Sequence, residues 1–191
     1  MLWYNCEMWK YRQTPNFDTV SVPSLGFIIH GTLGSYEGAV EWLCTPPNKR
    51  NPVSYSSAHF VIAKSGAVTQ LADIRTRTWH AGTVNKPDQY ASEVLPKSFG
   101  VYKNPNDSFI GIELEWFEGD KITPEQYKSL IDVIKFCGIQ NPVLLTHSQV
   151  TSFKADFGEY SKEIIETLKT KLSNPDKETI KQQIINLINQ L

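Results

Sequence analysis

PVLLTHSQVTSFKADFG, residues 142–158, joins the strand and the loop around which we expect the chain to be organised. The apolar run at residues 143–145 predicts a short buried strand that delivers His147 to the strand end, where functional sites are usually built. The polar loop that follows contains Lys154 and Asp156. Because zinc binds both imidazole nitrogen and carboxylate oxygen, His147 and Asp156 are candidate ligands of a zinc ion whose third ligand comes from elsewhere.

A second strand ends in the same way. Residues 25–30, LGFIIH, are apolar up to His30. Because the ends of parallel strands collect at one edge of a sheet, we expect His30 to approach His147 and to be the third candidate ligand. His59 lies inside an apolar run, where a structural role is the better interpretation, and His80 lies in a loop. No HExxH or CxxC signature is present, so spacing alone leaves a zinc site and purely structural histidines both open.

Two carboxylates share a third predicted strand. Residues 108–116, SFIGIELEW, alternate in part, so Glu113 and Glu115 are expected on the same face. A partly buried carboxylate near a metal is the usual general base of a zinc hydrolase, and the alternative is an ordinary strand glutamate paired with an arginine. Glu115 competes with Glu113 for the catalytic role. Lys154 is in turn either a donor to a developing oxyanion or a solvated loop lysine.

Amphipathic helices are expected between the strands. Apolar residues recur at helical spacing in three segments, residues 35–44, 123–137 and 159–172. Ser35 and Thr123 stand where each of the first two helices begins, and their hydroxyls can cap free backbone N–H groups. Residues 58–71 contain two apolar runs around a Lys-Ser-Gly turn, which predicts a β-hairpin. Strands and helices in this order predict an α/β fold.

The chain divides into three predicted parts. Residues 1–24 are aromatic-rich and irregular, and we expect an N-terminal arm laid over the main domain at residues 25–173. Residues 174–191 predict an amphipathic C-terminal helix. Its apolar stripe is expected to pack on the same domain or on a second copy of the chain, which would make the protein a homo-oligomer.

Composition excludes some classes of function. With 19 basic and 20 acidic residues among 191, the net charge is −1, which gives no electrostatic support for binding nucleic acid or an anionic membrane. The three cysteines form no CxxC pair and are typical of reduced thiols in a cytosol. The first residues contain no sustained apolar run, so we expect no signal peptide and no membrane span, and synthesis in the cytoplasm.

Several motifs together resemble a known family. They are FIIH ending at His30, SAHFVIAKSGAVTQ at 57–70, WHAG at 79–82, FIGIELE at 109–115 and THSQVTSFKADFG at 146–158. In this order, over about residues 25–170, the chain resembles the zinc-dependent N-acetylmuramoyl-L-alanine amidases of the type-2 amidase family, which are related to the peptidoglycan recognition proteins and the phage amidase lysozymes. The resemblance implies a mixed central β-sheet flanked by helices.

The resemblance also assigns roles to individual residues. It implies a zinc ion held by His30, His147 and Asp156. Glu113 would be the general base, and Lys154 would stabilise the oxyanion. His80, with Trp79 and the loop at 45–57, would line the substrate groove, although the family's histidine at the position of His80 is not a metal ligand. Two residues depart from the family pattern, since Gly31 follows His30 where relatives often have a polar residue, and Phe157 replaces an expected proline.

The implied function is hydrolysis of the amide bond between N-acetylmuramic acid and L-alanine in peptidoglycan. An endolysin would reach the cell wall through a separate pore and lyse the cell. One alternative is a cytosolic recycling amidase that acts on soluble anhydro-muropeptides. The other is a module that binds peptidoglycan without cutting it, although such modules usually lack a metal ligand and this chain keeps all three candidates.

Overall fold

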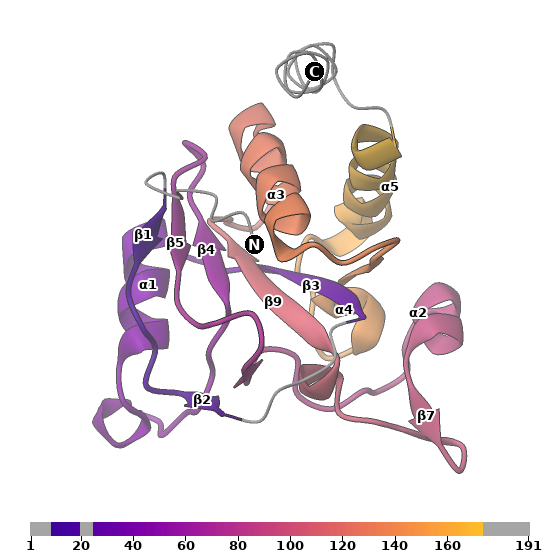
Figure 1. Ribbon diagram of the computed structural model, residues 1–191, viewed down its shortest axis with the longest axis horizontal. Coiled ribbons are helices and arrows are strands. Elements are labelled where there is room, and N and C mark those ends of the chain that lie inside the picture. The colour runs from indigo at the N-terminus through magenta and orange to yellow at the C-terminus, as the bar shows by residue number, and fades with distance from the viewer. Residues whose placement is uncertain (1–8, 20–24, 174–191) are drawn as a thin grey trace, which may run out of the picture.

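The centre of the fold is a mixed six-stranded β-sheet (Figure 1). This computed structural model describes residues 9–19 and 25–173. Across the sheet the strands follow the order β1 (Lys10–Tyr11), β5 (Val68–Gln70), β4 (Phe60–Ile62), β9 (Phe109–Leu114), β3 (Gly26–Gly31) and β10 (Val143–Thr146). The last four run parallel, whereas β5 is antiparallel to β4, as the predicted hairpin requires. The expected α/β fold with a mixed central sheet is confirmed.

Helices and short strand pairs connect the strands of this sheet. In the described residues the helices are α1 (Tyr36–Cys44), α2 (Gln89–Val94), α3 (Pro124–Cys137), α4 (His147–Val150) and α5 (Ser161–Ser173), with short 3-10 helices η1 (Pro47–Lys49), η2 (Pro105–Asp107) and η3 (Gly158–Tyr160). β2 (Phe17–Asp18) pairs with β6 (Arg77–Thr78), and β7 (Lys97–Ser98) pairs with β8 (Val101–Tyr102).

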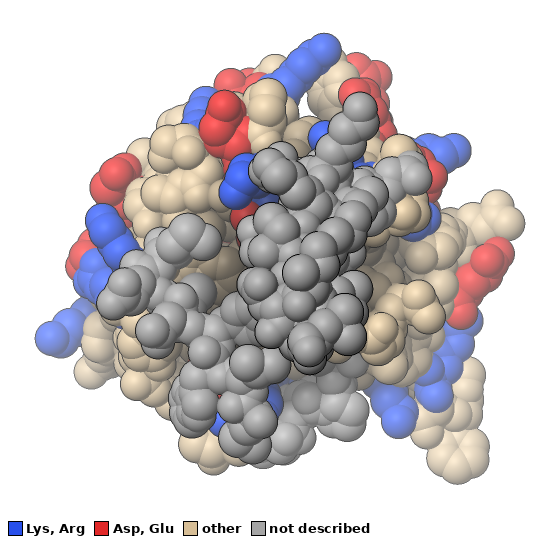
Figure 2. Space-filling model, turned by 45° about the horizontal axis from the view of Figure 1, so that its top comes forward, with Lys and Arg blue, Asp and Glu red and all other residues tan. Residues whose placement is uncertain are grey.

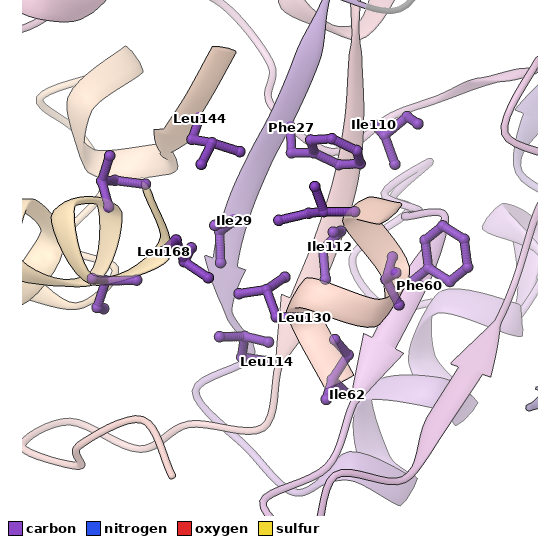
Figure 3. Close-up of a cluster of buried hydrophobic side chains, with 14 of the residues drawn as sticks. Phe27, Ile29, Phe60, Ile62, Ile110, Ile112, Leu114, Leu130, Leu144 and Leu168 are labelled. Carbon is purple, nitrogen blue, oxygen red and sulfur yellow. The ribbon is translucent and has the colours of Figure 1, made fainter. Parts of the chain in front are cut away.

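The two faces of the sheet carry different layers. Helices α3 and α5 cover one face (Figure 1), and Figure 3 shows Leu130 of α3 and Leu168 of α5 among buried side chains of the strands, such as Ile29. Because side chains alternate along a strand, Ile28 points to the other face. There it packs with α2 and α4, while α1 packs separately against β4. The strand ends between α1 and α4 are thus left to build a site.

Helices α1 and α3 begin directly after the capping residues that the sequence predicts. Ser35 Oγ accepts the N–H of Gly38 at the start of α1. At α3, Thr123 and Gln126 form a reciprocal capping box, and Gly138 ends the helix in the left-handed conformation, with φ 69°. Each cap satisfies backbone groups that the helix itself leaves free, which is why these boundaries could be predicted from the sequence.

The described part of the N-terminal arm is more regular than predicted. β1 adds a parallel strand to the sheet beside β5, and β2 pairs with β6. Trp9 packs edge-on against Phe60 and Phe136, with ring centroids 5.8 Å and 5.0 Å apart. Without β1, strand β5 would be a sheet edge with free backbone N–H and C=O groups, so the arm satisfies those groups as well as covering aromatic surface.

The loop predicted after His147 begins as a helical turn, α4. The Gln149 side chain accepts the backbone N–H of Thr146, which caps this turn at its start. A four-residue helix is too short to show apolar periodicity, so only the capping pair could have indicated it.

Side chains of both charges reach the surface on the face that Figure 2 shows. In Figure 2, basic and acidic side chains alternate around that face. None of the helices in residues 9–19 and 25–173 combines the length and apolar character that a bilayer span requires. The helix predicted at residues 174–191 lies outside the described residues, and the three-part division of the chain stays a prediction.

Candidate metal centre and cleft

Parallel pairing in register brings the predicted ligands to one place. His30 on β3 lies opposite Glu113 on β9. Thr146 on β10 lies opposite Ile29, so His147 follows at the same strand end. Because Ile29 faces α3 and α5, alternation turns His30 to the opposite face, toward the space between α1 and α4.

Three candidate ligands converge there. His30 Nδ1 and His147 Nδ1 are 3.0 Å apart, and Asp156 Oδ2 lies 3.7 Å from the first and 3.5 Å from the second. All three side chains are buried, and they form the group of potential metal ligands identified in the described residues. The loop that carries Asp156 therefore presents its carboxylate to both imidazoles, as expected.

Hydrogen bonds fix which ring nitrogen carries the proton. His147 Nε2 lies 2.9 Å from the carbonyl oxygen of Ala81, which can only accept, so Nε2 is the N–H. His80 Nε2 lies 3.0 Å from the Phe109 carbonyl and is likewise the N–H. The Nδ1 of a neutral His80 then accepts from His30 Nε2, 3.0 Å away. Burial lowers the pKa of His30 to about 4, and burial also lowers the pKa of His80 well below its usual value, so both rings are neutral at neutral pH.

This pattern leaves acceptors facing one another. With Nε2 of each ring directed at an acceptor, the Nδ1 atoms of His30 and His147 both present lone pairs beside the carboxylate of Asp156. Three acceptors with no donor between them repel one another unless a cation lies among them. Two imidazole nitrogens and one carboxylate oxygen are a ligand set that zinc uses in catalytic sites with an open position. The residues present therefore fit a bound metal ion.

The centre opens into a cleft of about 680 Å³, a size usual for small-ligand sites. Glu113 and Lys154 both line it, as the sequence predicts. Burial and the neighbouring carboxylate of Asp156 raise the pKa of Glu113 to about 8. A carboxyl group that titrates near neutral pH is suited to exchange protons during a reaction.

Two other predicted members of the site, Glu115 and Trp79, lie outside the cleft, whereas the loop at 45–57 reaches it at one residue. Glu115 does not line the cleft, and its carboxylate accepts the backbone N–H of Lys64 at 2.8 Å. Glu113 is thus the one of these two carboxylates that lines the cleft, and the assignment of the catalytic base stays a prediction. Trp79 is half-buried under the guanidinium of Arg77 and does not line the cleft. Of the loop at 45–57, Ser56 lines the cleft.

His80 borders the cleft but has no free nitrogen. It is only 8% exposed, and its two ring nitrogens contact His30 and the carbonyl of Phe109. A hydrogen bond from this ring to a substrate would require one of those contacts to break.

His59 has the structural environment that the sequence favoured. Its Nδ1 accepts the backbone N–H of Gly111 at 3.0 Å, and its Nε2 lies 3.0 Å from the carbonyl of Thr76. Both nitrogens are thus satisfied within the fold, and the ring contacts none of the candidate ligands by hydrogen bond.

Several cleft residues were missed by sequence reasoning. Large apolar side chains line the cleft and remain exposed, namely Leu33, Trp42 and Phe153. Trp42 lies off the buried stripe of α1, which consists of Tyr36, Val40 and Leu43. An aromatic residue on the exposed side of an amphipathic helix is a signal that could have identified it.

A sequence profile of the N-acetylmuramoyl-L-alanine amidase family matches residues 21–159. The chain belongs to this family. N-acetylmuramoyl-L-alanine amidase A of Achromobacter lyticus is 33% identical over 79 residues, which cover 41% of each chain. The 1,6-anhydro-N-acetylmuramyl-L-alanine amidase AmpD of Haemophilus influenzae is 30% identical over 95 residues, covering 50% of this chain and 41% of the relative. The match therefore spans less than half the length of either curated relative.

Solved structures show the same fold. A selenomethionine derivative of AmpD has a TM-score of 0.61 at 21% identity, with 85% of this chain and 94% of that chain covered. The N-acetylmuramoyl-L-alanine amidase LysC from Clostridium intestinale has a TM-score of 0.55 at 19% identity, with 86% and 97% covered. The Drosophila peptidoglycan recognition protein SD has a TM-score of 0.55 at 17% identity, with 81% and 86% covered. The amidase fold expected from the motifs is confirmed.

The two departures from the expected amidase pattern explain each other. Phe157 is 1% exposed and stacks edge-on against Trp116, with centroids 5.3 Å apart. A Cβ atom on Gly31 would lie 2.8 Å from the Trp116 ring and 3.4 Å from the Phe157 ring. A larger residue at position 31 would therefore displace this aromatic pair, which anchors the chain directly after Asp156.

Proposed function

We propose that the protein is a zinc-dependent hydrolase that cleaves the amide bond between N-acetylmuramic acid and L-alanine in peptidoglycan. The observation that carries the proposal is the convergence of His30, His147 and Asp156 at a cleft that also contains Glu113 and Lys154. Family membership supports the choice of an amide bond in peptidoglycan. The two curated relatives are both amidases of muramyl-L-alanine compounds by name.

Zinc would be held by His30 Nδ1, His147 Nδ1 and a carboxylate oxygen of Asp156. When bound, it supplies a Lewis acid that polarises the scissile carbonyl and makes water a stronger acid. The histidine tautomers and the buried carboxylate prepare this site before the ion arrives, because each ring already presents its Nδ1 lone pair.

Glu113 would act as the general base and then the general acid. Its carboxylate takes a proton from the attacking water and later delivers it to the nitrogen of the departing L-alanine. The cleft position of Glu113, in register with His30, supports this role. A bound cation would lower the pKa of Glu113 from its value of about 8 in the metal-free protein, which favours the basic form at neutral pH.

Lys154 would stabilise the oxyanion of the tetrahedral intermediate. It is exposed and lines the cleft two residues before Asp156, so its ammonium group can approach a carbonyl oxygen near the metal centre. An ammonium donor directed at developing negative charge lowers the barrier more than it strengthens substrate binding. The apolar rim of Leu33, Trp42 and Phe153 offers contacts for the sugar and the stem peptide.

A second candidate function differs from the first in its substrate. The similarity to the Haemophilus influenzae enzyme, whose name specifies a 1,6-anhydro compound, favours a recycling amidase that acts on soluble muropeptides. The amidase LysCS from Clostridium intestinale, which shares the fold at 19% identity, is an endolysin by name, and the corresponding function here would be lysis of the wall itself, with a separate pore giving access. Turnover on intact sacculi and on soluble anhydro-muropeptides separates the two.

The test is mass spectrometry of fragments released from purified peptidoglycan. We expect new L-alanine amino termini and intact glycan strands, with loss of activity on exhaustive chelation and recovery with zinc. Glu113→Gln should lower turnover by about 10²–10⁴-fold. Glu115→Gln is the matched control, because this glutamate lies on the same segment outside the cleft. Full activity after chelation or in Glu113→Gln would overturn the mechanism.

A further inference from the structure

Both candidate histidine ligands contact one dipeptide, His80–Ala81. His30 Nε2 lies 3.0 Å from the ring Nδ1 of His80. His147 Nε2 lies 2.9 Å from the carbonyl oxygen of Ala81. Two adjacent residues of one loop therefore meet the outer nitrogens of ligands that come from two different strands.

The dipeptide is itself held by Asn106. A single oxygen, Asn106 Oδ1, accepts the backbone N–H of His80 at 3.0 Å and that of Ala81 at 2.9 Å. Asn106 is only 3% exposed, and its own N–H donates to the side chain of Asn104 at 3.0 Å. Two N–H groups bound to one fixed oxygen set the orientation of the two peptide planes that flank the His80 Cα, and so fix the position of Ala81, whose carbonyl belongs to the next peptide unit.

The ring of His80 is held as firmly as its backbone. Its Nε2 lies 3.0 Å from the Phe109 carbonyl. The ring also packs on the backbone of Gly111, where an added Cβ atom would lie 2.4 Å from His80 Cγ. Only glycine at position 111 allows this close approach, so the His80 ring has one place to lie.

We propose that His80, the Ala81 carbonyl and Asn106 are positioning groups that hold His30 and His147 with Nε2 protonated and Nδ1 free for the metal. The inference rests on the zinc site of the proposed function and gives His80 a task other than substrate contact. A histidine with two acceptable tautomers must otherwise select one when metal binds. Partners that orient metal-bound histidines typically contribute about 10–100-fold to metal affinity.

Zinc affinity tests the proposal directly. The dissociation constant of zinc, measured by competition with a chromophoric chelator, should rise about 10–100-fold in His80→Phe, which keeps a ring but offers no acceptor. His80→Asn should recover part of the loss, because its side-chain oxygen can accept from His30. Asn106→Leu should weaken zinc binding through the Ala81 carbonyl.

His59→Phe is the matched control. His59 is another buried histidine, with its ring centroid 6.1 Å from that of His80, but it forms no hydrogen bond with a candidate ligand. Its replacement should lower the free energy of unfolding and leave zinc affinity within about threefold of the wild type, well short of the effect expected of an orienting residue. Equal zinc affinity in His80→Phe and the wild type, or equal losses in His80→Phe and His59→Phe, would overturn the positioning role.

Nuclear magnetic resonance of the wild-type protein reports the tautomers of His30 and His147 directly. This test does not depend on whether any variant folds. Long-range ¹H–¹⁵N spectra of the metal-free protein should show His30 and His147 as Nε2–H tautomers, with the Nδ1 resonances moving when zinc is added. A His30 ring protonated on Nδ1 would refute the inference. A wild-type protein that binds no zinc overturns the proposed function itself, whereas zinc binding that is indifferent to His80 overturns only the positioning role.

Discussion

Acid should destabilise the protein through His59. The neutral ring is fully satisfied, because Nδ1 accepts the Gly111 N–H and Nε2 faces the Thr76 carbonyl. Protonation of Nδ1 would bring two N–H groups face to face in a site that is 1% exposed. Burial accordingly lowers the pKa of His59 from 6.5 to about 4.

The magnitude follows from the difference in pKa between the two states. The folded protein binds the proton less readily than the unfolded chain, so the stability that His59 contributes is present above its unfolded pKa and is lost as the pH falls toward its folded pKa. The shift from 6.5 to about 4 corresponds to about 3 kcal/mol, at about 1.4 kcal/mol per pKa unit. Most of this should disappear between about pH 6.5 and pH 4.

Urea unfolding of the wild type and His59→Gln measures the effect. Both proteins are studied with a chelator present, so that loss of metal at low pH does not contribute. Between pH 7 and pH 4, the free energy of unfolding of the wild type should fall by about 3 kcal/mol more than that of His59→Gln. The comparison cancels the titration of other buried groups, which both proteins share. A difference that is independent of pH would refute the reasoning.

Three further substitutions test separate contacts. Lys154→Ala should lower kcat by about 10²–10³-fold with a small change in KM, measured on soluble muropeptides, because the oxyanion contact forms only in the transition state. Gly111→Ala should lower the free energy of unfolding by about 1–3 kcal/mol in urea and weaken zinc binding, because the added methyl displaces the His80 ring. Phe157→Ala should lower the free energy of unfolding by about 3–5 kcal/mol, since the ring is 1% exposed, and an unchanged urea midpoint would contradict its anchoring role.

Elements with local signals were predictable from the sequence. The apolar runs that end at His30 and His147 became β3 and β10, and the caps at Ser35 and Thr123 begin α1 and α3. These features depend on alternation, helical spacing and capping, which are properties of neighbouring residues. The convergence of the two histidines also followed, because parallel strands in register bring their ends together.

Features that depend on distant partners were not predictable. β1 is two residues long and has no periodicity of its own, and it forms because β5 offers a free edge. Glu115 shares the predicted strand with Glu113 but lies outside the cleft, and its carboxylate is held by the backbone N–H of Lys64. Lys64 lies 51 residues away from Glu115, so this contact leaves no local signal in the sequence.

The histidines show the same limit at atomic scale. Each of the four rings directs its Nε2 toward an acceptor, and the role of the ring depends on what faces Nδ1. In His59 and His80 that neighbour is an N–H group, so the ring is complete within the protein. In His30 and His147 it is another acceptor, beside the carboxylate of Asp156, and a cation is required to complete the set. The sequence separates the two pairs only by where each histidine stands relative to an apolar run, whereas the group that faces each Nδ1, such as the Gly111 N–H at His59 or the His30 ring at His80, lies far away in the sequence.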